Sequence, residues 1–487
     1  MIAISKHRYE AGLQCAKRLY LECTAPELRA PDDAGREALG QAGVEVGAMA
    51  RRRFPGGVLV EETRFEPAVD ATAQLVADPA VPAIYEAAFE HAGARIRADV
   101  LRRVGDAFEV IEVKAASRVR DRHEVELGLQ LAVLEGVGLV VARTLLVLLD
   151  REYVHEAGAP DLERLFQVVD LTEKARAALP AIRQNLGAMR SVVAAPAMPA
   201  VAPGPQCLVP RRCPFFGHCH AGGPDHPLTD LPRLTPDQLG ELTALGIEDI
   251  RAVPLDFPTL TPLQRRACVA VQTGGAVREP ALAERLHAIP LPAHFVDFET
   301  FAPAVPVYPG TRPFEQVPFQ WSDHVLAADG GVTHHEFLHD DDSDPRHAFA
   351  TSLLGATADA ASIVVYSAFE GDVLAALANE LPDLRAALLD RRSRIVDLLP
   401  IVREHGYHPQ LRGSFSIKAV LPAFVPTLGY GDLAIRDGLT ASLSHATLVD
   451  RTIAPARRAE LRGQLLAYCA RDTEAMLALY RVLGAPA

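Results

Sequence analysis

The N-terminal half of the chain alternates between short apolar runs and longer segments with helical spacing. The apolar runs 83–89, 96–104 and 108–114 predict three strands, and Gly105-Asp106 predicts the turn between the last two. Further apolar patterns predict two helices and one buried strand, at 36–53, 124–134 and 143–149 respectively. We therefore expect a mixed α/β domain in this half of the chain.

The pattern changes after this domain and returns near Ile289. The segment 192–205 is rich in Ala, Pro and Val and predicts a linker, and the segment 206–226 concentrates cysteine and histidine. Residues 230–275 predict short helices, with a turn at Leu245-Gly246-Ile247 that resembles helix-hairpin-helix modules. The expected parts are a first domain, a helical connector and a second α/β domain, over 1–226, 227–285 and 286–487.

Composition sets the broad class of the protein. The chain has 487 residues, 49% of them hydrophobic, which predicts two or three folded domains. Its longest apolar stretch, 137–149, contains Arg143 and is too short to span a membrane, and residues 1–8 lack the apolar core of a signal peptide. We therefore expect a cytoplasmic protein without a membrane partner, whose seven cysteines are reduced or bound to metal.

Two carboxylates stand on an apolar strand near the start of the second α/β domain. Asp297 and Glu299 are two residues apart, so they point to the same face of the strand. Phe295 shares that face while Val296 and Phe298 point to the other, which predicts burial on both sides. Buried like charges repel each other and are costly to desolvate, and a divalent metal ion removes both costs. Such carboxylates also contribute to the net charge of −13, which therefore does not exclude a nucleic-acid substrate.

Three further residues complete an acidic set in the same domain. Tyr468 and Asp472 are four residues apart and share one face of a predicted helix. Glu370 follows an apolar strand and a small-residue turn, and Asp397 is the alternative to it. A lone D-x-E is usually a surface pair, but D-x-E followed by a helical Y-x-x-x-D resembles the DEDD exonucleases, which normally have Asp where Glu370 stands. The resemblance implies two Mg²⁺ or Mn²⁺ ions and a water molecule oriented by Tyr468. The metal ligands that it implies are Asp297, Glu299 and Asp472.

A second candidate site lies in the N-terminal half. Asp99 precedes the strand residues Glu112 and Lys114 by one predicted hairpin, and these two share a face of their strand. Two acids and a lysine at one sheet edge can hold a metal ion and stabilise developing charge. The arrangement resembles the P-D-(D/E)-x-K nucleases of the RecB kind, whose glutamine motif Gln130 matches. The resemblance implies that Asp99 and Glu112 bind metal and that Lys114 and Gln130 belong to the catalytic set.

This second resemblance is incomplete at two places. RecB-like nucleases usually carry G-x-x-x-H upstream, whereas here Gly43 is followed by Gly47 and only Glu45 offers a substitute for the histidine. Leu134 stands where a tyrosine is common, and E-x-K on a strand is also an ordinary edge ion pair. The alternative interpretation is therefore a nucleic-acid binding or scaffold protein with one or both nuclease sites degenerate.

A cysteine cluster lies between the two domains, at Cys207, Cys213 and Cys219. The setting of Cys15, C-A-K-R-L-Y-L, resembles the N-terminal cysteine of iron–sulfur nucleases, namely the AddB type and the CRISPR adaptation nucleases. The resemblance implies that these four cysteines bind a mainly structural 4Fe–4S cluster. Zn²⁺ held by the three clustered cysteines and one histidine is the alternative. In the zinc alternative, the histidine ligand is either His218 or His220. Cys23 is an alternative to Cys15 as the N-terminal cysteine.

Nearly the whole chain is similar to domain-of-unknown-function family 2779. The similarity rests on 297–321, on 413–418 and on the segment from Tyr468 to Asp472. It implies a restriction-endonuclease-like domain, a helical connector and an RNase H-like 3′–5′ exonuclease domain, with nucleic acid as partner and single-stranded or frayed DNA as the expected substrate. Within the similar segments, we expect 308–312 to form a loop over the C-terminal site with Arg312 as a phosphate clamp. Lys418 either contacts a substrate phosphate, caps a helix or lies in solvent.

Overall fold

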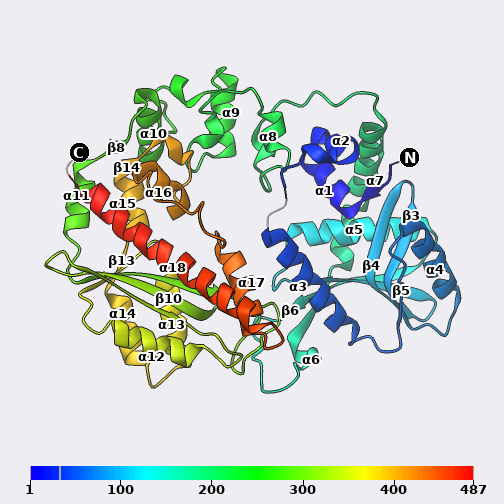
Figure 1. Cartoon of the computed structure of the whole chain (residues 1–487). Coiled ribbons are helices and arrows are strands. Elements are labelled where there is room, and N and C mark those ends of the chain that lie inside the picture. The colour runs from blue at the N-terminus through cyan, green and yellow to red at the C-terminus, as the bar shows by residue number, and fades with distance from the viewer. Residues whose placement is uncertain (1, 32–33, 486–487) are drawn as a thin grey trace. The chain divides into compact units, whose positions relative to one another are not determined.

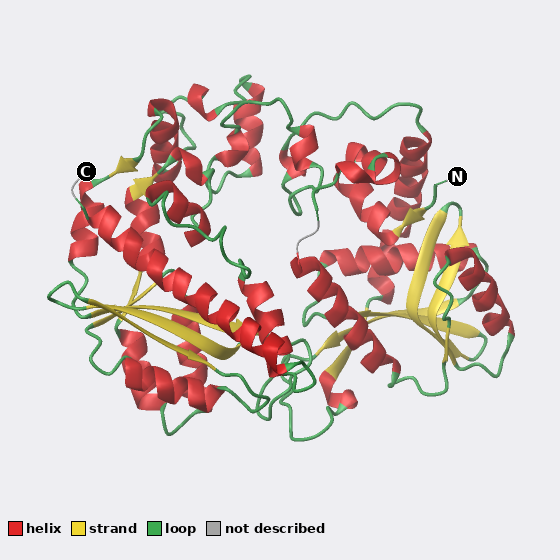
Figure 2. Ribbon diagram, viewed as in Figure 1, coloured by secondary structure: helices red, strands yellow, loops and turns green. Residues whose placement is uncertain are grey.

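The computed structural model describes residues 2–31 and 34–485, and the side chains of 34–39 are left out of the description. The chain packs as two compact units (Figure 1). Unit 1 comprises Met1–Ala221 with Pro303–Glu315, and unit 2 comprises Gly222–Ala302 with Gln316–Ala487. The expected connector 227–285 therefore packs as part of the C-terminal unit, and a short segment of the expected second domain belongs to unit 1. Both units are mixed α/β (Figure 2).

Unit 1 is built on a 7-stranded sheet of order β2-β3-β4-β5-β6-β7, with β1 pairing beside β4. The bounds are β1 Ile4–Ser5, β2 Val58–Leu59, β3 Ala83–His91, β4 Ala94–Val104, β5 Ala107–Lys114, β6 Val141–Leu149 and β7 Phe166–Asp170. β4 runs antiparallel to both β3 and β5, and β5 runs parallel to β6. The predicted turn between β4 and β5 is present, and Gly105 adopts a φ of 60° there, which glycine reaches without strain.

Helices cover both faces of this sheet. Their bounds are α1 Lys6–Gln14, α2 Ala16–Thr24, α3 Ala34–Arg51, α4 Phe65–Ala77, α5 Asp121–Gly136, α6 Leu162–Leu165, α7 Thr172–Ala194 and α8 Phe216–Cys219. One core joins α5 and α7 to the face of the sheet that carries Val110 and Leu146. A second core joins α3 to the opposite face, which carries Ile111 and Val147. Alternate residues of β5 and β6 therefore face opposite sides of the sheet, as predicted. Glu112 and Lys114 are on the side that faces α5.

Unit 2 is built on a 5-stranded sheet of order β11-β10-β9-β12-β13. The bounds are β9 Ala293–Phe301, β10 Val317–Leu326, β11 Val332–Leu338, β12 Ser362–Val365 and β13 Ile395–Asp397. β9 is central, antiparallel to β10 and parallel to β12. Phe295 packs in the core under α18, while Val296 and Phe298 pack in the core formed with α12, α13 and α14. Burial of β9 on both faces, predicted from its sequence, is therefore confirmed.

Helices again cover both faces, with α18 across one face and α12 to α14 against the other (Figure 1). Their bounds are α9 Pro236–Ala244, α10 Pro262–Thr273, α11 Pro280–His287, α12 Arg346–Ala356, α13 Phe369–Glu380, α14 Arg385–Ser393, α15 Leu398–His405, α16 Ile417–Phe424, α17 Gly438–Val449 and α18 Pro455–Gly484. Two short strands, β8 Val277–Arg278 and β14 Gly406–Tyr407, pair antiparallel. Of the helices that the structure describes, none is both long and apolar enough to cross a lipid bilayer.

The connector helices belong to unit 2 because they share its core. α9 and α10 each begin with a capping box, formed by Thr235 with Gln238 and by Thr261 with Gln264. Their apolar faces, which include Leu242 and Cys268, pack in the same cluster as α18. The predicted turn after α9 is present, with Gly246 at a φ of 75°. This shared core, together with the packing of α11 on α18, makes the segment part of the C-terminal unit and not a separate domain.

Candidate functional site

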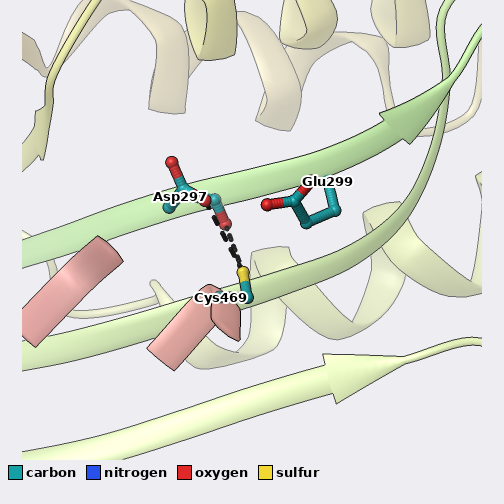
Figure 3. A group of neighbouring side chains, drawn as sticks. All are labelled: Asp297, Glu299 and Cys469. Carbon is teal, nitrogen blue, oxygen red and sulfur yellow. Dashed lines mark hydrogen bonds between the residues drawn. The ribbon is translucent and has the colours of Figure 1, made fainter. Parts of the chain in front are cut away.

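An acidic cleft lies in unit 2 at the centre of the sheet. Its volume is about 870 Å³, and its lining includes all five residues that the sequence predicted for this unit. These are Asp297 and Glu299 of β9, Glu370 of α13, and Tyr468 and Asp472 of α18. Figure 3 shows Asp297 and Glu299 on one strand, with Cys469 of α18 facing Asp297. Residues up to 175 positions apart in sequence therefore meet in one place, as the spacing had predicted.

Local structure explains why each side chain reaches the cleft. The strand period of two places Asp297 and Glu299 together, and the helical spacing of four does the same for Tyr468 and Asp472. β12 ends at Val365 and α13 begins at Phe369, so Glu370 stands in the first turn of that helix. The alternative, Asp397, caps α15 by accepting a 2.9 Å hydrogen bond from the backbone N–H of Leu399 and is outside the cleft lining. The geometry favours Glu370 over Asp397.

The carboxylates of the cleft repel one another. Burial, together with the neighbouring charge of Asp472, raises the pKa values of Asp297 and Glu299 well above their usual range. Burial also raises the pKa of Glu370 to about 8, and its Oε2 atom has no hydrogen-bond partner in the described part of the chain. The pKa of Asp472 rises to about 6 because burial outweighs the hydrogen bond from Tyr430. Negative charge in this cleft is therefore costly without a cation.

The donor set fits a hard divalent cation. Asp297, Glu299 and Cys469 offer ligand atoms that lie within 4.8 Å of one another. Carboxylate oxygens are the ligands that Mg²⁺ and Mn²⁺ prefer. Cys469 Sγ lies 3.7 Å from Asp297 Oδ2, and burial raises the pKa of this thiol well above its usual value. Cys469 therefore acts as a neutral neighbour of Asp297, and the carboxylates supply the charge that a cation needs.

Two contacts in the cleft could not be assigned from the sequence. The contact of Tyr430 was not predicted, and the role of Lys418 was left as one of three possibilities. The hydroxyl of Tyr430 donates a 2.5 Å hydrogen bond to Asp472 Oδ1. Lys418 Nζ donates to the hydroxyl oxygen of Tyr468 at 2.9 Å and to the backbone O of Arg436 at 2.6 Å. Of the three possibilities considered for Lys418, the helix cap is wrong, because its ammonium lines the cleft instead. No motif marks Tyr430, which is brought to Asp472 only by the fold.

Two arginines line the same cleft. Arg233 comes from the connector and Arg403 from α15. Neither side chain forms a hydrogen bond or an ion pair with any residue that the structure describes. Arg233 also has a φ of 53°, a left-handed conformation that costs a non-glycine residue about 1 kcal/mol. Two arginines that form no ion pair in the described chain thus stand beside the buried carboxylates, and the charge of Arg403 also acts on Asp397.

The N-terminal candidates also meet in one place, within unit 1. Gln130 Nε2 of α5 donates a 2.6 Å hydrogen bond to Glu112 Oε2, and Lys114 Nζ lies 2.7 Å from Glu112 Oε1. Asp99 of β4 accepts a 2.6 Å hydrogen bond from the backbone N–H of Val113. Burial, followed by the charge of Glu112, raises the pKa of Asp99 to about 7. The four predicted residues therefore form one cluster.

Lys6 joins this cluster although no sequence motif indicated it. Its Nζ atom lies 2.9 Å from each carboxylate oxygen of Glu112. Although burial opposes the shift, the ammonium groups of Lys6 and Lys114 lower the pKa of Glu112 to about 2. Glu126 of α5 adds a third acid, 2.7 Å from Lys114 Nζ. Glu45, the substitute considered for the missing histidine, is an exposed residue of α3.

The four cysteines of the predicted cluster surround one small cavity of unit 1. Cys15, Cys207, Cys213 and Cys219 all line it. Cys23 instead packs against the main core of the unit, and neither His218 nor His220 belongs to the lining. A tetrahedral zinc site brings thiolates to within about 4 Å of one another. Across the described ranges, no three cysteine sulfurs lie within 4.8 Å of one another.

The segment Pro303–Glu315 packs within unit 1. The backbone N–H of Gly310 donates to the backbone O of His155 at 2.9 Å, and the backbone N–H of His155 donates to the O of Thr311 at the same distance. Arg312, expected to clamp a phosphate over the C-terminal site, lies 3.4 Å from Glu152 of unit 1. The expectation came with the family resemblance of this segment, and the structure packs the segment in unit 1.

The fold and the cleft define a mixed α/β protein with a buried acidic site. Residues 294–416 match the family described as Domain of unknown function (DUF2779). The match begins on β9 and includes Asp297, Glu299 and Glu370, whereas Tyr468 and Asp472 lie beyond its end. It supports the predicted similarity for this segment. No curated protein matches the sequence.

Proposed function

We propose that the protein is a metal-dependent nuclease whose C-terminal unit hydrolyses phosphodiester bonds. The observation that carries the proposal is the set of four carboxylates that face one cleft, Asp297, Glu299, Glu370 and Asp472. Among the described residues, none of them forms an ion pair with lysine or arginine. The sheet order, with one strand antiparallel to the central β9 and another parallel to it, supports the RNase H-like fold predicted for this unit.

The chain's own residues suit this chemistry. Two divalent cations bound by the carboxylates would activate a water molecule and stabilise the leaving oxygen. Tyr468 accepts a hydrogen bond from Lys418 and donates its own O–H to Asp472. Once a metal ion binds Asp472, this O–H would be available to a water molecule or a phosphate oxygen. Burial, followed by the charge of Asp472, raises the pKa of Tyr468, so the phenol stays protonated as a donor. Tyr430 holds Asp472 in place through its 2.5 Å hydrogen bond.

A nucleic-acid strand is the substrate class that the cleft walls suit best. Arg233 and Arg403 form no ion pair in the described chain, and each can bind a phosphate. Phe369 and Phe415 line the cleft as half-buried rings on which bases can stack. A cleft with both features takes a strand with its bases unpaired, which favours single-stranded or frayed DNA over duplex. Net charge does not oppose this, because the basic groups are local to the cleft.

Arg233→Ala and Arg403→Ala should weaken strand binding in a salt-dependent way. Each loss is expected to reduce the slope of log Kd against log salt by about 0.7, the value for one phosphate contact with a single strand. The measurement is fluorescence anisotropy with a labelled oligonucleotide in the Asp297→Asn background, which prevents cleavage. Arg285→Ala, an exposed arginine outside the cleft lining, is the control. Unchanged slopes in both cleft variants would contradict this substrate assignment.

The proposed activity is tested by a degradation time course on end-labelled single strands with Mg²⁺, with Mn²⁺ and with a chelator. An exonuclease gives a ladder that shortens from one end and requires the metal ion. DNA and RNA strands of the same sequence, each labelled at either end, determine the substrate and the direction. Intact strands under all metal conditions would overturn the proposal.

For the cysteine site of unit 1 we propose a 4Fe–4S cluster. The four thiols line one cavity, and burial raises the pKa values of Cys207 and Cys213 when no metal is bound. Cluster binding removes the thiol protons and links α1 and α2 to the cysteine segment that follows α7. Zinc held by the three clustered cysteines and one histidine is the alternative, and neither His218 nor His220 lines the cavity.

Protein purified without air is expected to contain about four iron and four sulfide per chain, with a visible charge-transfer absorption. Cys207→Ser should lose the iron and the absorption and lower the thermal stability of unit 1, because a cross-link between distant segments is lost. Cys23→Ser is the matched control and should keep the iron, since Cys23 packs in the main core. Stoichiometric zinc without iron would overturn the cluster assignment.

A second candidate function is nucleic-acid binding by unit 1 without cleavage. The contacts of Glu112 favour it, because this carboxylate already holds two ammonium groups and an amide. The two functions are compatible, since one unit can hold a strand while the other hydrolyses it.

A further inference from the structure

The carboxylate of Glu112 is saturated with donors. A carboxylate offers about four lone-pair positions to donors or metal ions. Lys6 Nζ contacts both oxygens at 2.9 Å, Lys114 Nζ contacts Oε1 at 2.7 Å, and Gln130 Nε2 contacts Oε2 at 2.6 Å. Four contacts therefore occupy the positions through which Glu112 would bind a cation. The predicted metal ion does not fit unit 1 in this arrangement.

Lys6 is the member of the set that stands in the place of a metal ion. Lys114 and Gln130 belong to the expected nuclease motif, whereas Lys6 reaches Glu112 from outside it. Lys6 is the first residue of α1, and Ser5 before it pairs with β4, the strand that carries Asp99. At the other end of α1, Gln14 Nε2 donates to the backbone O of Gln206 and of Arg211, both at 2.7 Å. The helix is anchored at both ends, so the ammonium is held over Glu112.

The C-terminal cleft shows the opposite arrangement. Its four carboxylates form no ion pair with lysine or arginine in the described chain, and Glu370 Oε2 has no hydrogen-bond partner there. Unit 1 therefore holds two ammonium groups in direct contact with its carboxylate, whereas in unit 2 Lys418 acts on Glu299 and Asp472 through its charge and pairs with neither in the described chain. Coulomb repulsion between an ammonium and a divalent ion a few ångströms apart disfavours binding of both.

We propose that the Lys6 ammonium takes the place of the divalent cation in unit 1, so that this nuclease-like site does not bind metal and does not cleave. The site keeps a folded, charge-compensated acidic cluster, and metal-dependent hydrolysis is confined to unit 2. The proposal concerns unit 1 alone, so it stands or falls independently of the activity proposed for unit 2.

The test is a Mn²⁺ titration followed by electron paramagnetic resonance, which counts free and bound ion. The full chain carries Asp297→Asn and Asp472→Asn, so that the cleft of unit 2 no longer contributes. This double variant, the parent of the further variants, is expected to bind no Mn²⁺ through unit 1. Adding Lys6→Ala should raise the Mn²⁺ affinity at least about tenfold, because a competing charge is removed. Adding Asp99→Asn as well should abolish the gain.

Two results would overturn the proposal. One is Mn²⁺ binding by the parent that Asp99→Asn removes, which would place a metal beside Lys6. The other is a folded Lys6→Ala variant that gains no Mn²⁺ binding. Circular dichroism reports folding, and Lys6→Met, which keeps the length of the side chain without its charge, replaces the alanine variant should that one unfold.

Discussion

Replacing Asp297 by asparagine is expected to slow strand hydrolysis by at least about 1,000-fold, because one charged metal ligand is lost at the centre of the acidic set. The side chain keeps its size, and its pKa is raised by burial and by the charge of Asp472, so removal of the charge also relieves repulsion in the metal-free protein. We therefore expect a variant that is inactive and at least as stable as the wild type in chelator. A substitution that damaged the packing of the core would instead lower both the activity and the stability of the protein.

The measurement is the initial rate of nucleotide release from an end-labelled single strand, with thermal unfolding in chelator as the second readout. Glu336→Gln is the matched control, since Glu336 is an exposed carboxylate on β11 of the same sheet and outside the cleft lining. The control should keep the wild-type rate. An Asp297→Asn protein that cleaves as fast as the control would contradict the assignment of the cleft.

The second large effect is on how stability depends on pH. The pKa of Glu370 is raised from an ordinary 4.5 to about 8, chiefly by burial. The folded state therefore binds a proton that the unfolded state has released, and stability falls as pH rises between these two values. This loss of stability is absent at pH values below the pKa of Glu370 in the unfolded state. It is complete at pH values above its pKa in the folded state. Mg²⁺ binds the deprotonated cluster, so its stabilising effect should be greatest at the alkaline end.

Comparison of wild type with Glu370→Gln isolates this contribution from every other titrating group. In chelator, the melting temperature of the wild type should fall relative to the variant by roughly 5 °C or more as pH rises through this window. Saturating Mg²⁺ should restore the wild type at alkaline pH and have less effect on the variant. If the melting temperatures of the two proteins change in parallel over the whole pH range, Glu370 does not carry the buried charge.

Local patterns in the sequence were sufficient to predict β3 to β6 and β9 and to group the carboxylates. The β4–β5 hairpin follows from apolar runs on either side of Gly105-Asp106, and the pairing of Asp297 with Glu299 follows from the period of a strand. Both depend on neighbours in sequence, so both are readable without a structure. The choice of Glu370 over Asp397 needed more, because both follow apolar strands and only the fold shows that Asp397 caps α15.

Contacts between distant segments could not be predicted in this way. Lys6 follows a serine in an ordinary helix start, and nothing near it in sequence indicates Glu112, which lies 106 residues away. Tyr430 reaches Asp472 across 42 residues without a motif. The segment 303–315 lies in sequence between two strands of unit 2, yet two of its backbone hydrogen bonds are made with His155 of unit 1. Each of these contacts is set by how the elements pack, which short-range periodicity does not report.

The most direct test of the account is anomalous X-ray diffraction from crystals of the full chain soaked in Mn²⁺. We expect two peaks about 3.5–4 Å apart in the cleft of unit 2, within ligand distance of carboxylate oxygens. Those carboxylates are Asp297, Glu299, Glu370 and Asp472. We expect no peak beside Glu112, where Lys6 supplies the positive charge. Crystals with no manganese in the cleft, or with these carboxylates turned away from one another, would contradict it.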